Sequence, residues 1–599
     1  MNSKTTGIWF VIAALLFAFA FFWERHAHGP AASANILPGL EPSTVTGIEI
    51  FPAGALEIRA IRTNGNWQLT RPIAYPAQTA AIEMLLGALQ KLTPAFKMSA
   101  AEVREQRTTE TEFGFDNPQF SIAVEAGDHS WQLKVGNKTA PGNQVYLRVV
   151  GADGAIVTDT DWLGFIPRSA NDWRDTALMD AGIACDHVVL TNGTKAIELQ
   201  CDATNHLWRM LRPLQARADG GHITEALQKV CTAQVSQFVT DDTNADLAAF
   251  GLQPADLDLC LGHGSNFVAA VHIGKTLTND STQVFARREG WNAIVTTAKE
   301  PLSFWRGTVN DFRDPHLIEL TAPVAEIEVR GQHSFTLQQK GSNDWVVAGE
   351  KFPGDAENVQ QFIKFLAGFQ VAEFVKDVVT PPDWQAYGFA TPTNQIILRS
   401  AVGDTNAVIA QLLFGAMQTN EIYVRRADED FIYGLALTDF NNLAALYGES
   451  WEFRDRHIWD FDGTNVAAIT LHQNGKTRQM IHTGPDKWRL ADGSQGIIND
   501  AAIEETAYRL GKLTVLYWMG RNITEPDKYG LNTNNLQITV ELRNGEKNTV
   551  DFGTELPRAQ TALAAVTLDD GRWAFVFPPV LYQFVLSYLT IPVPHGGIP

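Results

Sequence analysis

The sequence predicts an α+β protein with four homologous units in series, preceded by a transmembrane helix. An aromatic-Gly-apolar turn recurs at intervals of 137, 137 and 142 residues, with its glycine at Gly114, Gly251, Gly388 and Gly530. In every period, β-rich segments stand before and after a segment with the apolar spacing of an amphipathic helix. One long apolar run lies at the N-terminus, at residues 8–23. A chain of 599 residues is also too long for a single hydrophobic core.

The N-terminal apolar run extends from Ile8 to Trp23. Its length is at the short end of what a bilayer core of about 30 Å requires. A cleaved signal peptide needs a small-x-small site directly after the run, whereas the best candidate ends at Ala34, eleven residues beyond Trp23. We therefore predict a retained single-pass anchor at residues 8–23 in the cytoplasmic membrane, with Lys4 inside. The rest of the chain is then extracytoplasmic (periplasmic), and cleavage is the alternative.

The predicted organisation follows from the anchor and the repeat period. Residues 1–34 contain the cytoplasmic tail, the anchor and the start of a tether that we expect to continue to Pro42. The repeat units are expected at residues 35–181, 182–320, 321–462 and 463–599. Each unit has about 140 residues, which is enough for a core of its own and for a mainly antiparallel sheet.

Each unit carries the same residue marks in the same order. A tryptophan follows the first hairpin, and we expect it in the core of its unit; these residues are Trp67, Trp208, Trp345 and Trp488. Another aromatic follows 29 or 30 residues later, at Phe96, Phe238, Phe374 and Trp518. After the glycine turn, the second strand ends on an apolar-Gly pair, at Gly136, Gly274, Gly415 and Gly553. A glycine between large apolar residues indicates a positive φ or a close approach of two backbones.

This ordered set of marks resembles the bacterial family called domain of unknown function 4340. The resemblance covers nearly the whole chain beyond the tether, in about four copies. It implies a membrane-anchored extracytoplasmic protein of a kind often found beside ABC-type export permeases. No catalytic residues are established for the family, so none are carried over to this chain.

An aromatic-Arg-Asp triplet closes each of the first three units. The triplets are Trp173-Arg174-Asp175, Phe312-Arg313-Asp314 and Phe453-Arg454-Asp455. We interpret them as inter-unit fasteners in which the aromatic fills a gap and the charges bond to backbone ends. The alternative is a repeated site for anions or carboxylates, because guanidinium binds such groups bidentately.

The second unit contains all four cysteines of the chain, Cys185, Cys201, Cys231 and Cys260. Outside the cytoplasm thiols tend to pair. A two-residue turn at Asn192-Gly193 would place Cys185 opposite Gln200, next to Cys201. A Cys185–Cys201 disulfide is therefore the candidate bridge, with Cys231–Cys260 as a further pair. Four buried free thiols are the alternative.

Composition and motifs limit the function. A net charge of −20 and a pI near 5.1 argue against nucleic-acid binding, which needs a basic face. The sequence has no phosphate loop, zinc motif or nucleophile elbow, so we predict no catalytic, metal or cofactor residues. We expect a non-enzymatic accessory or scaffold protein that associates with an ABC-type transporter or envelope complex. A module that binds a glycan or anion between units, and an envelope hydrolase, are the alternatives.

Overall fold

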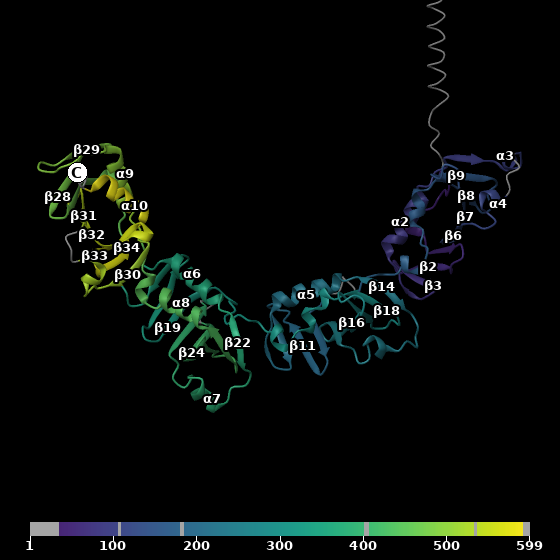
Figure 1. The fold of residues 1–599 in the computed structure, drawn as a ribbon, viewed down its shortest axis with the longest axis horizontal. Coiled ribbons are helices and arrows are strands. Elements are labelled where there is room, and N and C mark those ends of the chain that lie inside the picture. The colour runs from purple at the N-terminus through teal and green to yellow at the C-terminus, as the bar shows by residue number, and fades with distance from the viewer. Residues whose placement is uncertain (1–34, 106–109, 180–184, 401–406, 532–535, 591–599) are drawn as a thin grey trace, which may run out of the picture. The chain divides into compact units, whose positions relative to one another are not determined.

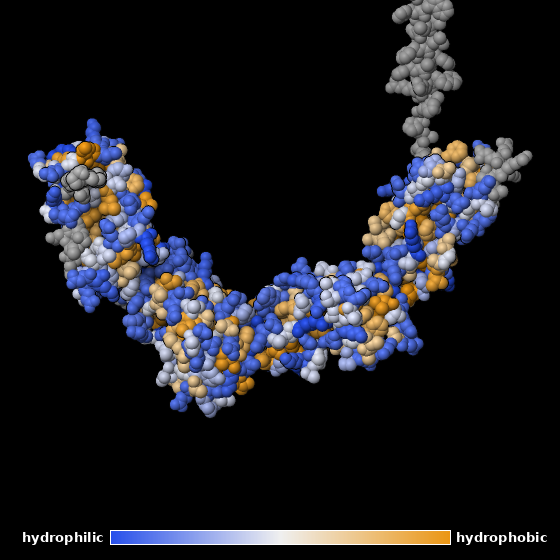
Figure 2. Space-filling view, in the orientation of Figure 1, coloured by the Kyte–Doolittle hydropathy of each residue, from blue (hydrophilic) through white to orange (hydrophobic). Residues whose placement is uncertain are grey.

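The structure is a computed structural model that describes residues 35–105, 110–179, 185–400, 407–531 and 536–590. The predicted anchor at residues 8–23 lies outside these ranges. Within them, no helix has the length and apolar character needed to cross a bilayer. The chain divides after Arg313 into two compact units, each of which contains two of the repeats. Figure 2 shows apolar residues as small patches among polar ones on the visible face of both units.

The first repeat forms one nine-stranded antiparallel sheet (Figure 1). Its strands lie in the order β4-β3-β2-β1-β6-β7-β8-β9-β5. Its strands and helices are, in chain order, β1 (Gly47–Pro52), β2 (Ile58–Thr63), β3 (Asn66–Arg71), β4 (Tyr75–Pro76), α2 (Thr79–Gln90), β5 (Phe96–Met98), α3 (Ala100–Glu105), α4 (Glu110–Phe113), β6 (Phe120–Ala126), β7 (His129–Lys138), β8 (Gln144–Val149) and β9 (Ala155–Asp159). Because β4 and β5 lie at opposite edges of the sheet, α2 connects the two edges.

The second repeat has the same strand order, β13-β12-β11-β10-β15-β16-β17-β18-β14. Its strands and helix are β10 (His187–Asn192), β11 (Lys195–Cys201), β12 (Trp208–Arg212), β13 (Ala216–Arg217), α5 (Gly220–Thr232), β14 (Val235–Thr240), β15 (Leu257–His263), β16 (Asn266–Thr276), β17 (Gln283–Arg288) and β18 (Ile294–Ala298). Helix α5 again connects one sheet edge to the other.

The third and fourth repeats each form an eight-stranded sheet that lacks the short strand before the main helix. The third contains β19 (Val324–Arg330), β20 (Phe335–Gly341), β21 (Asp344–Val347), α6 (Ala356–Ala367), β22 (Val371–Lys376), α7 (Pro381–Ala386), β23 (Asn394–Ser400), β24 (Ala407–Met417), β25 (Glu421–Arg426), β26 (Ile432–Ala436) and α8 (Leu437–Tyr447). The fourth contains β27 (Val466–Gln473), β28 (Lys476–Gly484), β29 (Lys487–Leu490), α9 (Asp500–Gly511), β30 (Tyr517–Arg521), β31 (Leu536–Leu542), β32 (Lys547–Leu556), β33 (Thr561–Leu568), β34 (Gly571–Val576) and α10 (Pro579–Phe584).

The described ranges thus contain four antiparallel sheets and few helices, which confirms the α+β class with mainly antiparallel strands. The strands of each sheet come from one repeat, so the repeats do not share sheets. Each main helix buries one apolar stripe, because residues at i, i+3, i+4 and i+7 lie on one face. In α2 the buried residues are Ile82, Leu85, Leu86 and Leu89, which join strand residues in the core of the first repeat.

The segment directly before the first sheet corrects the predicted tether. Ile36, Leu37 and Leu40 are buried in the core of the first repeat. The backbone N–H of Ile36 also donates to the carbonyl of Leu92, 2.9 Å away. Apolar side chains that can reach a core dock on it, even in a proline-containing stretch. The tether predicted to reach Pro42 was therefore wrong from residue 35 onward.

The two glycine marks of each repeat form one packing contact. The turn glycines Gly114, Gly251, Gly388 and Gly530 all have φ between +68° and +80°. A Cβ on any strand-end glycine would lie only 2.0–2.2 Å from the carbonyl oxygen of the aromatic before the turn glycine. The backbone of the turn therefore packs directly against the end of the second strand. Both expectations are confirmed: the turn glycine has a positive φ, and the strand-end glycine allows the close approach of two backbones. Only glycine fits both positions without strain.

The repeat tryptophans lie in the core, on β3, β12, β21 and β29. In the first and fourth repeats the indole N–H donates to a glutamate of the main helix. Trp67 Nε1 lies 3.0 Å from Glu83 Oε1, and Trp488 Nε1 lies 2.8 Å from Glu504 Oε2. The tryptophan therefore links the strand to the helix, because its ring is buried in the core and its N–H is bonded to a helix residue.

Candidate functional site

Arg174 is the centre of the contact between the first and second repeats. Its side chain is 1% exposed, and its Cζ lies 4.2 Å and 3.8 Å from the ring centroids of Tyr75 and Phe238. Its Nη1 and Nη2 donate to the two carboxylate oxygens of Asp241, at 3.0 Å and 2.6 Å. Tyr75 belongs to the first repeat, whereas Phe238 and Asp241 belong to the second. Cation–π contact and a bidentate ion pair therefore join the repeats at one side chain.

Arg454 makes the equivalent contact between the third and fourth repeats. Its Nη1 lies 2.5 Å from Asp570 Oδ2. Its Cζ lies 4.4 Å from the ring of Trp573 and 5.2 Å from that of Phe352. The ring of Trp518 is 5.4 Å away, and its Nε1 donates to the carbonyl of Arg454. We call the two arrangements, around Arg174 and around Arg454, the arginine clamps.

The aspartate of each triplet turns the chain toward the next repeat. The N–H of Asp175 donates to the carbonyl of Pro76, and its Oδ1 accepts the N–H of Ala177. This Asx-type turn is followed by a β-bridge from Ala177 to Gln234 of the second repeat. At the other clamp, the N–H of Asp455 donates to the carbonyl of Pro353, and its Oδ1 accepts the N–H of His457. A β-bridge then joins His457 to Thr514 of the fourth repeat.

The structure modifies the predicted roles of the triplet residues. The aromatics Trp173, Phe312 and Phe453 are buried, and each aspartate accepts a backbone N–H two residues on. The two clamp arginines, however, bind carboxylates and aromatic rings rather than backbone ends. Arg313 is buried, with its Nη1 3.3 Å from Asn310 Oδ1, and Asp314 Oδ1 accepts the N–H of His316.

The acids of the clamps were missed by sequence reasoning. Asp241 directly follows β14, whereas Asp570 lies in the β33–β34 hairpin, so the two have no common position in the repeat. The aromatic rings that contact the clamp arginines could have been predicted from the sequence. Phe238 and Trp518 belong to the aromatic series at fixed distance from the repeat tryptophan. That regular spacing was the available signal for the partner of each arginine.

A groove of about 530 Å³ lies beside the second clamp, between the third and fourth repeats. Its walls come from α6, α8, the 3₁₀ helix at Ser450–Phe453, and the edge strand β30. The lining residues are Asn358, Gln361, Ala445, Leu446, Tyr447, Glu452, Arg456, Leu516, Tyr517, Trp518 and Met519. Leu446, Tyr517 and Met519 are exposed, so an apolar wall faces solvent. This inter-repeat groove is the candidate binding site.

Two charged residues set the electrostatics of the inter-repeat groove. Burial raises the pKa of Glu452 to about 7, and the nearby Glu449 carboxylate also raises it. The positive charge of Arg456 is balanced by two acids, because its Nε donates to Asp355 Oδ2 at 2.6 Å and the Glu357 carboxylate lies 3.6 Å from its Nη2. The groove can therefore offer an apolar and aromatic wall with one carboxyl group that changes protonation near neutral pH.

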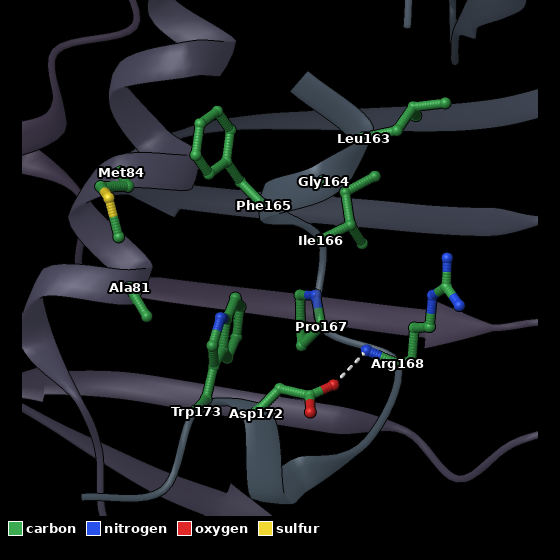
Figure 3. Close-up of a pocket in the computed structure, with 10 residues that line it drawn as sticks. All are labelled: Ala81, Met84, Leu163, Gly164, Phe165, Ile166, Pro167, Arg168, Asp172 and Trp173. Carbon is green, nitrogen blue, oxygen red and sulfur yellow. Dashed lines mark hydrogen bonds between the residues drawn. The ribbon is translucent and has the colours of Figure 1, made fainter. Parts of the chain in front are cut away.

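A smaller pocket of about 340 Å³ lies on the first repeat (Figure 3). Ala81 and Met84 of α2 form one side, and the Leu163–Arg168 segment faces them with Phe165 toward Met84. The only hydrogen bond drawn there joins the Arg168 N–H to Asp172 Oδ2, and it holds the loop rather than a ligand. Because this pocket offers no convergent polar groups, we rank it below the inter-repeat groove.

One polar cluster of the second repeat was also missed from the sequence. His272 lies between two acids, with Nδ1 bonded to Asp258 and Nε2 to Glu289 at 2.6 Å. Desolvation lowers the pKa of His272, but its bonds to the two acids raise it more. Asp258 and His272 are directly opposite on β15 and β16, which is a cross-strand pair. Within the described ranges, no group of three or more His, Cys, Asp and Glu is arranged to hold a metal ion.

The predicted Cys185–Cys201 disulfide is absent, because all four cysteines are free thiols in the structure. Asn192 pairs with Lys195, so the turn is one residue further along than predicted. This register leaves Cys185 beyond the end of β10, where its Sγ donates to the carbonyl of His187. Cys201 ends β11 and its N–H donates to the carbonyl of Asp186. Burial raises the pKa of the Cys185, Cys201 and Cys260 thiols.

Comparison with known proteins gives one family. The model of a domain of unknown function (DUF4340) matches residues 67–188, 208–350 and 345–534, which together make up more than half of the chain. Each match begins at a repeat tryptophan: Trp67, Trp208 and Trp345. No curated protein matches the chain.

Proposed function

Because the chain belongs to the DUF4340 family, which has no defined function, we propose its role from its own architecture. We propose a non-enzymatic scaffold protein, anchored in the cytoplasmic membrane by residues 8–23, with its repeats outside the cytoplasm. Its partner is an ABC-type transporter or an envelope complex. The observation that supports this role most is the use of buried charge at the arginine clamps.

The clamps support a scaffold because their charged groups join one repeat to the next. Arg174 and Arg454 each hold an acid and aromatic rings across a repeat boundary. Two repeats that are joined in this way can present one surface to a partner. An enzyme would instead gather such groups around a reacting centre.

The start of the first core limits how far the repeats can lie from the membrane. Ile36 is already packed in the first repeat, and the predicted anchor ends at Trp23. Eleven residues, 24–34, separate the anchor from the described chain. Fully extended, they span at most about 40 Å. The first repeat is then held close enough to contact the extracytoplasmic parts of an integral membrane partner.

Purification of the full chain from native membranes tests this role. After gentle crosslinking and extraction in mild detergent, we expect permease or ATPase subunits of a transporter, or components of one envelope complex, to co-purify. The matched control carries residues 1–34 fused to an unrelated soluble domain, and it should lose these partners. Recovery of the full chain alone would contradict the scaffold role.

The inter-repeat groove favours a second candidate function, the binding of a glycan. Its exposed Tyr517 offers a ring for stacking, and Glu452 and Asn358 offer polar groups beside it. Titration of the full chain with envelope glycan fragments, followed by calorimetry, tests this. Binding should fail in Tyr517→Ala and survive in Tyr508→Ala, an exposed tyrosine on α9 of the same repeat. Equal binding by both variants would exclude the groove.

A further inference from the structure

The hairpin formed by β1 and β2 ends in an apolar turn that projects into solvent. Residues 51–56 read Phe-Pro-Ala-Gly-Ala-Leu, and none of their side chains is charged or can form a hydrogen bond. Phe51 is 43% exposed and Leu56 is 72% exposed, and Ala53 and Ala55 between them are exposed as well. We call residues 51–56 the apolar tip. Large apolar side chains that are exposed together mark an interaction surface.

The first hairpin of each of the other three repeats has a polar tip. These tips are residues 192–195, 330–334 and 473–476, which read Asn-Gly-Thr-Lys, Arg-Gly-Gln-His-Ser and Gln-Asn-Gly-Lys. All of these residues are described, and none of them is an exposed large apolar residue. The fold of the repeat therefore does not require an apolar tip. Only the repeat that directly follows the predicted anchor has one.

The backbone holds the apolar tip in a defined turn. The N–H of Ala55 donates to the carbonyl of Pro52, 3.2 Å away, and the N–H of Ala53 donates to the carbonyl of Gln119, 2.9 Å away. Gly54 supplies the positive φ, +71°, that lets the chain reverse. A tip with a fixed conformation loses little conformational entropy when it binds.

The apolar tip and the start of the described chain lie toward the same end of the first sheet. At this end β1 ends and β6 begins, β7 ends and β8 begins, and β9 ends beside the start of β8. Strand β5 is antiparallel to β9 and therefore begins toward this end. Thr158, near the end of β9, donates its hydroxyl to the carbonyl of Thr93, and the N–H of Ile36 donates to the carbonyl of Leu92. The anchor and the apolar tip therefore approach the sheet from one end.

We propose that the apolar tip inserts into the extracytoplasmic surface of the lipid bilayer that holds the anchor. Residues 24–34 span at most about 40 Å, so the first repeat stays within reach of this surface. Contact with lipid requires only apolar area, which the tip supplies. A protein partner is less suitable, because the central residues of protein interfaces are most often Trp, Tyr and Arg, and the tip contains none of them.

The charges next to the apolar tip do not oppose this contact. Glu57 accepts a bond from Arg71 at 2.7 Å, and Glu49 pairs with Arg59 at 3.0 Å. Two apolar side chains bind lipid weakly by themselves, but the anchor keeps the tip at a high effective concentration beside the bilayer. Insertion gives the first repeat a second attachment and so limits its rotation about the anchor. This inference rests on the proposed membrane anchoring.

Photocrosslinking in spheroplasts tests the proposal. The full chain carries Ala55→p-benzoylphenylalanine, and adducts of the peptide that contains position 55 are identified by mass spectrometry. We expect adducts with membrane phospholipid, at a yield about fivefold or more above that of Thr194→p-benzoylphenylalanine at the polar tip of the second repeat. Adding Phe51→Ser and Leu56→Ser should reduce the lipid adduct about tenfold or more, because the two largest apolar side chains of the tip are lost.

A matched control and a membrane extraction make the outcomes distinct. Met84→Ser with Phe165→Ser replaces two other exposed apolar residues of the same repeat and should leave the yield at position 55 unchanged. An adduct with another protein in place of lipid, or a lipid yield no higher than at the second tip, would overturn the proposal. The anchor stands in either case if the chain stays with membranes in alkaline carbonate. Release of the chain by carbonate would overturn the anchor and the apolar-tip proposal together.

Discussion

At the scale of single residues, the repeat is defined by groups that only one amino acid can supply. The turn glycine has a positive φ and also lets its backbone approach the second strand. The clamp arginine offers a planar guanidinium that stacks on rings and bonds to an acid simultaneously. These residues therefore support two predictions about stability.

Gly251→Ala should destabilise the second repeat more than Gly264→Ala. Both glycines have positive φ, so each substitution costs about 1 kcal/mol in backbone strain. Only Gly251 has a close neighbour, since an added Cβ would lie 2.8 Å from the Lys275 nitrogen. We expect a total of about 3 kcal/mol for Gly251→Ala. Hydrogen exchange of β15 and β16 measures the difference, and equal exchange in the two variants would show that the contact is unimportant.

Arg174→Lys should weaken the contact between the first two repeats by on the order of 2 kcal/mol, because lysine loses the bidentate bond and the stacking. The expected signal is faster hydrogen exchange at Ala77, Ala177 and Gln234, which flank the clamp. Arg212→Lys is the control, since that side chain is 75% exposed and pairs with Glu198 on the surface. Unchanged exchange in Arg174→Lys would mean that the clamp does not hold the repeats.

At the scale of elements, each main helix connects the two edges of its sheet, and the chain after the closing helix forms the junction. In the third repeat, α8 is followed by the 3₁₀ helix at Ser450–Phe453. Glu452 caps this helix by accepting the N–H of Glu449, and its carbonyl accepts a bond from Asn358 on α6. Glu452, which lines the groove, therefore also stabilises the junction. Because its protonation state affects that stability, a stability measurement can report its protonation.

The stability of this junction should depend on the protonation of Glu452. Its pKa is raised from 4.5 in the unfolded chain to about 7 in the folded one, so the folded state favours the protonated form. The resulting stability is fully present below pH 4.5 and is lost as the pH rises through 7. Glu452→Gln should remove this loss, so the variant is more stable than the native chain at pH 8 but not at pH 4.5. Hydrogen exchange of α8 at both pH values measures it.

The control for this experiment is Glu505→Gln on α9, which removes an exposed acid paired with Arg509. It should show the same pH dependence as the native chain. A Glu452→Gln variant whose pH dependence also equals that of the native chain would contradict the raised pKa.

At the scale of the whole molecule, the proposed membrane attachment depends on residues that precede the first core. Because the core begins at Ile36, deletion of residues 1–34 removes no described contact of the repeats. The repeats should fold without the anchor, and location should change without a change in stability.

Fractionation of cells tests this separation. The full chain should stay with membranes in alkaline carbonate, and protease added to spheroplasts should digest its repeats. A chain of residues 35–599 behind a cleavable signal peptide should be soluble after export. N-terminal sequencing of the full chain decides between the two alternatives for residues 8–23. A mature N-terminus near residue 35 would show that the apolar run is a cleaved signal peptide.

The sequence by itself determined the repeat period, the order of strands and helices, and the buried tryptophans and turn glycines. These features follow from local rules, since apolar periodicity specifies the face of an element and a positive φ requires glycine. The same rules did not identify the docked segment at Ile36, because its few apolar residues have no regular period. They also did not reveal that Gly251 and Gly274 belong to one contact.

Only the tertiary structure decided which distant groups meet. The pairing of β14 with β18 at the sheet edge places Phe238 where Arg174 can reach it, and nothing local to either residue specifies that contact. Strand register is equally sensitive: a turn displaced by one residue pairs His187 with Gln200, the residue that the prediction placed opposite Cys185. Cross-strand partners depend on turn geometry and on packing across the whole sheet, so the arginine clamps and the inter-repeat groove emerge only when the repeats are folded and joined.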